Sequence, residues 1–93
     1  MIIFKVKHIP SGLYWKGGGI PTYQGYGLKY LEPDELLAKV VKLKFSIHGK
    51  TWPTIGYVHS AVNPLVNDKY MGAILKDCVI EQYEVNLVKT FPV

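Results

Sequence analysis

The strongest constraint on the fold is a strand, a tight reversal and a second strand at the amino end of the chain. Between residues 2 and 8 the side chains alternate, with one face formed by Ile2, Phe4, Val6 and His8 and the other by Ile3, Lys5 and Lys7. A period of two is typical of a half-buried β-strand. Pro10 and Gly12 supply the fixed and the positive backbone φ angles that a turn requires. We therefore expect a β-hairpin formed by residues 2–8 and 13–16.

The length and composition predict one domain, spanning residues 1–93. A chain of 93 residues can bury one modest hydrophobic core and is too short for two. Hydrophobic residues make up 48% of it and charged residues 19%, which is typical of a globular protein. The apolar run after Met1 ends at Lys5, and no later stretch reaches membrane-spanning length. We expect a cytoplasmic protein that does not interact with a membrane.

A short helix followed by a strand is expected in the middle of the chain. Pro33 fits the first position of a helix, and the acidic residues that follow it complement the helix dipole. Apolar residues at helical spacing support it: Leu36, Leu37, Val40 and Val41. From residue 41 to residue 47 the period changes to two, which predicts a strand with Lys42 and Lys44 on its polar face.

A second hairpin and a second short helix are expected next. Residues 48–51 suit a turn with Gly49 at a positive φ, and residues 52–58 would return as its partner strand. Pro53 places that strand at a sheet edge, because proline cannot donate to a ladder, and such an edge leaves room for dimerisation by sheet extension. The helix would begin at Asn63-Pro64 and bury a stripe that comprises Val66, Tyr70, Ala73 and Ile74.

The closing strand is expected over residues 77–88. Val79, Glu81 and Tyr83 share one of its faces. Its acidic residues are expected to lie opposite the lysines of residues 41–47, as weakly favourable cross-strand pairs. The fold class predicted from all these elements is α+β: a small, mainly antiparallel β-sheet with one or two short helices.

The glycine-rich segment from Gly17 to Gly27 carries no cofactor motif. Its glycines and proline exclude a helix. Gly25-Tyr26-Gly27 begins like a dinucleotide fingerprint, but Tyr30 stands where the third glycine is required. Lys44 stands where a phosphate-binding loop ending at Gly49-Lys50-Thr51 would need its first glycine. We expect no cofactor.

The residues that most often carry catalysis or bind metals are scattered. His8, His48 and His59 lack the spacing of metal ligands. The single cysteine, Cys78, cannot form an internal disulfide, and its apolar neighbours predict a small buried residue. No base is placed in the sequence to activate its thiol. We therefore expect neither an enzyme nor a metal site.

Lysines and amphipathic aromatic residues dominate the predicted surface. The net charge of +4 comes from lysine alone, so the chain attracts anions but lacks the bidentate fork of arginine. Tyrosine and tryptophan anchor interfaces; Trp52 and Tyr83 are expected in the core, and for the aromatic residues around the glycine-rich segment both core and exposed positions stay open. The predicted partner-binding residues are Tyr14, Trp15, Lys16, Tyr23, Tyr26, Tyr30, Lys42 and Lys44.

Two segments resemble a group of small, mostly uncharacterised tailed-bacteriophage proteins. The first is Lys5-x-Lys7-His8-Ile9-Pro10-Ser11-Gly12-Leu13-Tyr14-Trp15-Lys16, and the second, which looks like their closing strand, is Cys78-Val79-Ile80-Glu81-Gln82-Tyr83-Glu84-Val85. Residues 17–73 depart from the group. The resemblance implies a phage origin and an early accessory role in an infected bacterium, and it transfers no catalytic residues.

These observations predict a non-enzymatic phage accessory protein that binds a bacterial host protein, such as a defence or transcription component, and inhibits or redirects it. The alternative is a single-stranded nucleic-acid-binding module, in which lysines follow the phosphates and bases stack on aromatic rings. Acidic residues interspersed among the lysines weaken that alternative. A second alternative is a protein that sequesters a small ligand or nucleotide through the glycine-rich segment.

Overall fold

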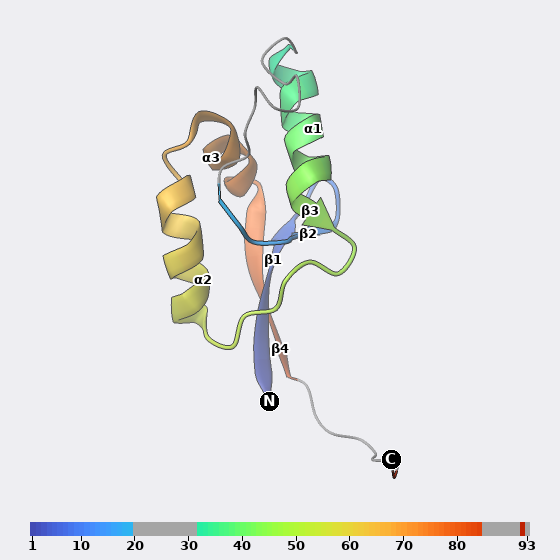
Figure 1. The fold of residues 1–93 in the computed structure, drawn as a ribbon, viewed down its shortest axis with the longest axis vertical. Coiled ribbons are helices and arrows are strands. Elements are labelled where there is room, and N and C mark those ends of the chain that lie inside the picture. Colours follow the sequence, from blue (N-terminus) through green and yellow to red (C-terminus); the bar gives the residue numbers. More distant parts are fainter. Residues whose placement is uncertain (20–31, 85–91, 93) are drawn as a thin grey trace.

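The computed structural model describes residues 1–19, 32–84 and 92. Within these residues the chain forms an antiparallel sheet of four strands with three α-helices on one of its faces (Figure 1). The strands are β1 (Ile2–His8), β2 (Leu13–Trp15), β3 (Phe45–Ser46) and β4 (Cys78–Glu84). The helices are α1 (Pro33–Lys44), α2 (Ile55–Val62) and α3 (Lys69–Leu75), with a 3₁₀-helix η3 (Asn63–Leu65) between the last two. The predicted α+β class is confirmed, although the helices outnumber the one or two expected.

The order of strands across the sheet is β3-β2-β1-β4, so β1 is central. The predicted amino-terminal hairpin is confirmed: Lys7 lies opposite Tyr14, and Gly12 adopts a φ of 72° in the turn. On the other side of β1, strand β4 pairs along its whole length, from Ile2 opposite Glu84 to His8 opposite Cys78. β1 and β4, which are far apart in the sequence, therefore lie side by side in the sheet (Figure 1).

A hydrophobic core fills the space between the sheet and the helices. Trp15 and Trp52 stack within it, with ring centroids 5.6 Å apart and planes inclined by 25°. Large aromatic side chains supply much of the buried area in a domain of this size. The buried apolar residues are Phe4, Val6, Trp15, Leu36, Val40, Phe45, Trp52, Val58, Leu65, Met71 and Ile74.

The strand predicted for residues 41–47 is wrong, because α1 continues through Lys44. Leu36 and Val40, one helical turn apart, are both buried, so a helix serves the core at least as well as a strand. Lys42 and Lys44 lie in the last turn, where positive charge complements the helix dipole. Of the strand predicted over residues 41–47, only β3 is present. The predicted pairing of acidic residues with these lysines is also wrong, since the partner of β4 is β1.

The strand predicted for residues 52–58 is wrong as well. Thr54 caps α2, because its hydroxyl accepts a hydrogen bond from the backbone N–H of Tyr57 at 3.2 Å. Trp52 forms only an isolated bridge, exchanging two backbone hydrogen bonds of 2.9 Å with Phe4. Pro53 therefore does not mark the sheet edge that was predicted there. The turn before it is confirmed at Gly49, which has a φ of 62°.

The helix predicted from Asn63 is interrupted. Asp68 is the N-cap residue of α3, because its carboxylate accepts hydrogen bonds from the N–H groups of Tyr70 and Met71. Ile74 is buried as predicted. Val66 and Ala73 are exposed, so their predicted burial is wrong.

Candidate binding surface on strand β4

The face of the sheet that points away from the helices is open. Because side chains alternate along a strand, this open face carries every second residue of β1, β2 and β4. It comprises Ile3, Lys5, Lys7, Tyr14, Ser46, Val79, Glu81 and Tyr83, and none of these described residues is buried.

A polar cluster crosses three strands of the open face. The Tyr14 hydroxyl, from β2, donates to Oε1 of Glu81 at 2.8 Å and lies 2.9 Å from the Tyr83 hydroxyl. Tyr83 donates to the same carboxylate oxygen at 2.6 Å. The ammonium groups of Lys5 and Lys7 lie 4.8 and 5.9 Å from the centroid of the Tyr14 ring. We call these five residues the Tyr14 cluster.

The Tyr14 cluster favours the ordinary charge states of Glu81 and Tyr83. Hydrogen bonds from Tyr83 and Tyr14, followed by the nearby lysine charges, lower the pKa of Glu81. The same carboxylate raises the pKa of Tyr83 by accepting a hydrogen bond from its hydroxyl. Neither group is therefore poised to exchange a proton near neutral pH. The cluster suits recognition rather than acid–base chemistry.

An apolar groove runs beside β4 on the helix side of the sheet. Its volume is about 280 Å³. Val79 and Ile80 at its margin are 44% and 37% exposed. This β4 groove is lined by Val6, His59, Val62, Asn63, Val66, Leu75, Cys78, Val79 and Ile80.

A second hollow of about 270 Å³ continues from the β4 groove. The two hollows share Cys78 and Val79. The second one reaches the amino-terminal hairpin, where Ile9 is 55% exposed. Apolar surface therefore follows β4 as far as the β1–β2 turn.

The edge of β4 that faces away from β1 pairs with no other described strand. We call it the outer edge. An unpaired edge presents backbone N–H and C=O groups that another strand can bind. At β4 such an edge adjoins both the Tyr14 cluster and the β4 groove, which lie on opposite faces of the same strand.

Cys78 and His8 lie side by side in the sheet without forming a catalytic pair. The thiol of Cys78 donates to the carbonyl of Ile74 at 3.4 Å, and burial, with a contribution from Asp77, raises its pKa to about 12. His8 is buried with Nδ1 2.8 Å from the Ser11 hydroxyl, and burial lowers its pKa while Asp77 opposes the shift. A protonated thiol is a poor nucleophile. Among the described residues, no group of three or more metal-ligating side chains is placed to hold an ion.

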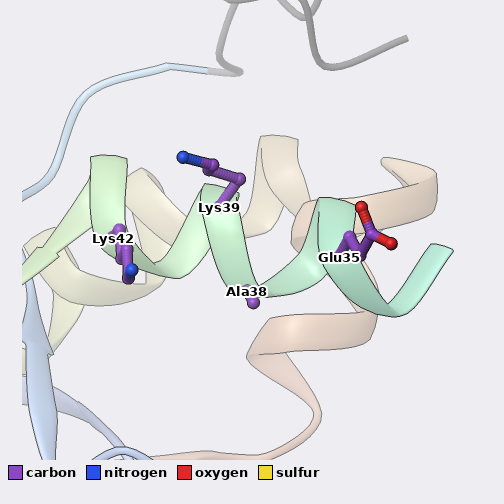
Figure 2. Close-up of a pocket in the computed structure, with 4 residues that line it drawn as sticks. All are labelled: Glu35, Ala38, Lys39 and Lys42. Carbon is purple, nitrogen blue, oxygen red and sulfur yellow. The ribbon is translucent and has the colours of Figure 1, made fainter. Parts of the chain in front are cut away.

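The hollow on α1 has different chemistry. It has a volume of about 230 Å³ and is lined by Glu35, Ala38, Lys39 and Lys42. Figure 2 shows that these side chains project from one helix and do not converge, with Lys39 and Lys42 pointing in opposite directions. Ligand sites bring a few polar groups together at one point, and this hollow does not.

The predicted binding residues do not form one surface. Trp15 is fully buried, so its predicted role at an interface is wrong: the pleat of β2 turns it into the core and its neighbour Tyr14 onto the open face. Lys16 is exposed after β2, whereas Lys42 and Lys44 lie on α1 rather than on a strand. The remaining predictions, Tyr23, Tyr26 and Tyr30, lie outside the described residues.

The two aromatic residues assigned to the core have different outcomes. Trp52 is buried as predicted, but Tyr83 is 36% exposed on the open face, so its predicted burial is wrong. The exposure of Val79 and Ile80 was also missed. The sequence carried only part of the signal: adjacent apolar residues point to opposite faces of a strand, but the structure is needed to show that β4 is an edge strand, where both cannot enter the core.

No protein-family model matches the chain, and searches of curated proteins and of solved structures likewise found no match. In the described part of the chain, every helix is too short or too polar to cross a membrane.

Proposed function

We propose that this chain is a non-enzymatic protein that binds another protein through β4 and the β4 groove. The observation that carries the proposal is the exposed apolar surface gathered at the β4 groove: its lining includes Val66, which follows η3, and Val79 and Ile80 of β4. Single exposed apolar residues are ordinary, but contiguous apolar surface marks interaction sites.

The size of the groove limits how the partner binds. A stable interface buries about 800 Å² on each partner, whereas a groove of about 280 Å³ accommodates only a few side chains. The partner is therefore expected to extend beyond the groove. Ile9 provides exposed surface at the hollow that continues from the groove, and Tyr83 provides exposed surface on the other face of β4.

The kind of partner follows from the resemblance of the hairpin and of β4 to small phage proteins. A phage accessory protein without an active site acts by attaching to a component of the infected cell. We therefore propose that the partner is a bacterial host protein, such as a defence or transcription component, which binding inhibits or redirects.

The proposal is tested by comparing two substitutions during capture from a bacterial host lysate. Ile80→Glu places a charge at the β4 groove, where desolvating it costs several kcal/mol. Ile47→Glu is the matched control, because Ile47 is 75% exposed next to β3, at the opposite edge of the sheet. We expect a stoichiometric protein to be recovered with the wild type and with Ile47→Glu, and its recovery to fall at least tenfold with Ile80→Glu. The proposal fails if Ile80→Glu recovers as much protein, or if the wild type recovers none.

A second candidate function is supported by the Tyr14 cluster. Lys5 and Lys7 flank an aromatic ring on an open sheet face, an arrangement that suits single-stranded nucleic acid. Glu81 within the cluster opposes it. Binding of labelled oligothymidine, measured by fluorescence anisotropy, should then fall steeply as salt is raised and weaken in a Lys5→Gln, Lys7→Gln double variant. Binding that is absent or insensitive to salt would eliminate this candidate.

A further inference from the structure

We propose that the partner binds as an added β-strand, pairing with the outer edge of β4 and placing an apolar side chain in the β4 groove and a lysine or arginine beside Glu81. This inference rests on the proposed function and states the chemistry of the segment that β4 recognises.

The direction of the backbone groups follows from the hydrogen bonds of β1. Phe4 exchanges backbone hydrogen bonds with Trp52, on the side of β1 away from β4. The N–H of Ile9 instead donates to the carbonyl of Asp77, towards β4. Backbone groups alternate in direction along a strand. The odd-numbered residues of β1 therefore point their N–H and C=O groups at β4.

The register transfers this alternation to β4. Residues 3, 5 and 7 of β1 lie opposite Tyr83, Glu81 and Val79, whose backbone groups therefore bind β1. Ile80 and Gln82 lie between them and direct their N–H and C=O groups to the outer edge. An added strand would find its main-chain partners at these two residues.

The side chain of the added residue opposite Ile80 has a defined environment. Residues directly opposite in a sheet share a face, so this side chain points to the helix side, as Ile80 does. There it would meet the apolar wall formed by Val62, Val66 and Leu75. A valine, isoleucine or leucine fits that environment, whereas a charged group would be desolvated.

The neighbouring residue of the added strand lies opposite Glu81, on the open face. The lysines of the Tyr14 cluster come from β1, on the inner side of β4, so the outer side of Glu81 lacks a cation among the described residues. Opposite charges directly across a strand pair are favourable, and like charges are unfavourable. A basic residue at that position therefore complements β4.

The same charge argues against a second copy of the chain as the occupant. In the antiparallel register that pairs all seven residues of two β4 strands, Glu81 would lie opposite Glu81 of the other copy. That like-charge contact is destabilising. A segment of a different protein, with basic and apolar residues at adjacent positions, avoids it.

Proline at Gln82 tests the pairing. Gln82→Pro removes an N–H that points to the outer edge and leaves the hydrogen bonds to β1, a placement that edge strands tolerate. Gln82→Thr is the matched control, because it keeps the N–H and suits a strand. We expect Gln82→Pro to bind the protein captured by the wild type at least tenfold more weakly, and Gln82→Thr to bind like the wild type. Circular dichroism and thermal melting establish that both variants are folded.

Two measurements do not depend on the proline variant. On binding, the Ile80 and Gln82 amides of the wild-type chain should become protected from hydrogen exchange, whereas those of Val79 and Glu81 should be protected already by their pairing with β1. Glu81→Lys should weaken binding several-fold and Glu81→Gln less. Overlapping peptides from the captured protein should place the affinity in a segment with adjacent basic and apolar residues.

The outcomes separate this inference from the proposed function. A partner that depends on Ile80 but binds Gln82→Pro normally, without protecting the Ile80 amide, overturns strand addition and leaves the proposed function standing. The absence of any partner that depends on Ile80 overturns both. A wild-type dimer in sedimentation that Gln82→Pro dissociates overturns the assignment of a different protein as the occupant, as does capture of nucleic acid alone.

Discussion

The two faces of the sheet are built from the same strands and have opposite chemistry. On the helix side, Phe4, Val6 and Trp15 are buried in the core. On the open face, Lys5 and Tyr14 belong to a cluster of hydrogen bonds and cation–aromatic contacts with no buried member among the described residues. Moving by one residue along a strand therefore takes a side chain from the core to the open face, or the reverse. Residue type alone therefore does not reveal which aromatic side chains are available to a partner.

Tyr14 and Trp15 make this comparison most directly, because they are adjacent. Trp15 is fully buried and stacks on Trp52, while Tyr14 lies across β1 and reaches Glu81. The first residue contributes mainly to stability and the second mainly to the character of the surface.

The largest effect is expected from removing Trp15. Trp15→Ala should lower the free energy of unfolding by about 3–5 kcal/mol, because it deletes a fully buried aromatic ring. Tyr14→Ala, on the open face, should lower it by no more than about 1 kcal/mol, the scale of an exposed hydrogen bond or charge pair. Denaturant unfolding followed by circular dichroism measures both. Equal losses from the two substitutions would contradict the division between the faces.

Smaller effects are expected from alanine substitution at two helical glycines, with stability lowered at one and raised at the other. A Cβ at Gly72 of α3 would clash with the carbonyl oxygen of Val66, so Gly72→Ala should lower the free energy of unfolding by about 1–3 kcal/mol despite the better helix propensity of alanine. At Gly56 of α2 the nearest atom to a Cβ is Thr54 Oγ1 at 3.8 Å, so Gly56→Ala should raise it by up to about 1 kcal/mol. Thermal melting distinguishes the two signs. Stabilisation by Gly72→Ala would show that the α3–η3 contact is looser than described.

The sequence was sufficient where the local pattern has one interpretation. The alternation of β1, the turn at Gly12 and the run of β4 are such cases, and all are present. Residues 41–47 have two interpretations, because Val41 and Leu43 fit a strand by alternation and also pack beside the buried stripe of α1. Tertiary packing decided between them, and no local rule contains that information.

The candidate site was less predictable than the fold. Tyr14 was identified, but the partners that define its surroundings, Glu81 and Tyr83, are 67 and 69 residues away in the sequence. Their proximity depends on β4 pairing with β1, and the sequence was interpreted as pairing β4 elsewhere. Long-range register therefore limits what can be inferred about a binding surface.

The smallest expected effect is a difference in the pH at which each face of the sheet loses its contribution to stability. Burial holds the pKa of His8 below its ordinary value of 6.5, so the unfolded chain takes up the proton first and stability is lost as pH falls through 6.5 towards the lower pKa of the folded state. Hydrogen bonds from Tyr83 and Tyr14 hold the pKa of Glu81 below 4.5, so its contribution is lost only as pH falls below 4.5. The core face should therefore respond to acid before the open face does.

Two variants test whether these two losses of stability at low pH come from His8 and from Glu81. His8→Asn should abolish the fall in melting temperature between pH 7 and the lower pKa of His8, because asparagine does not titrate. Tyr14→Phe removes one hydrogen bond to Glu81 and should move the pKa of that carboxylate up towards 4.5, as measured by NMR titration of its carboxyl carbon, while the step due to His8 stays unchanged. If Tyr14→Phe also altered the upper step, the two faces would be coupled through β1, and the Tyr14 cluster would then be part of what stabilises the fold as well as a surface feature.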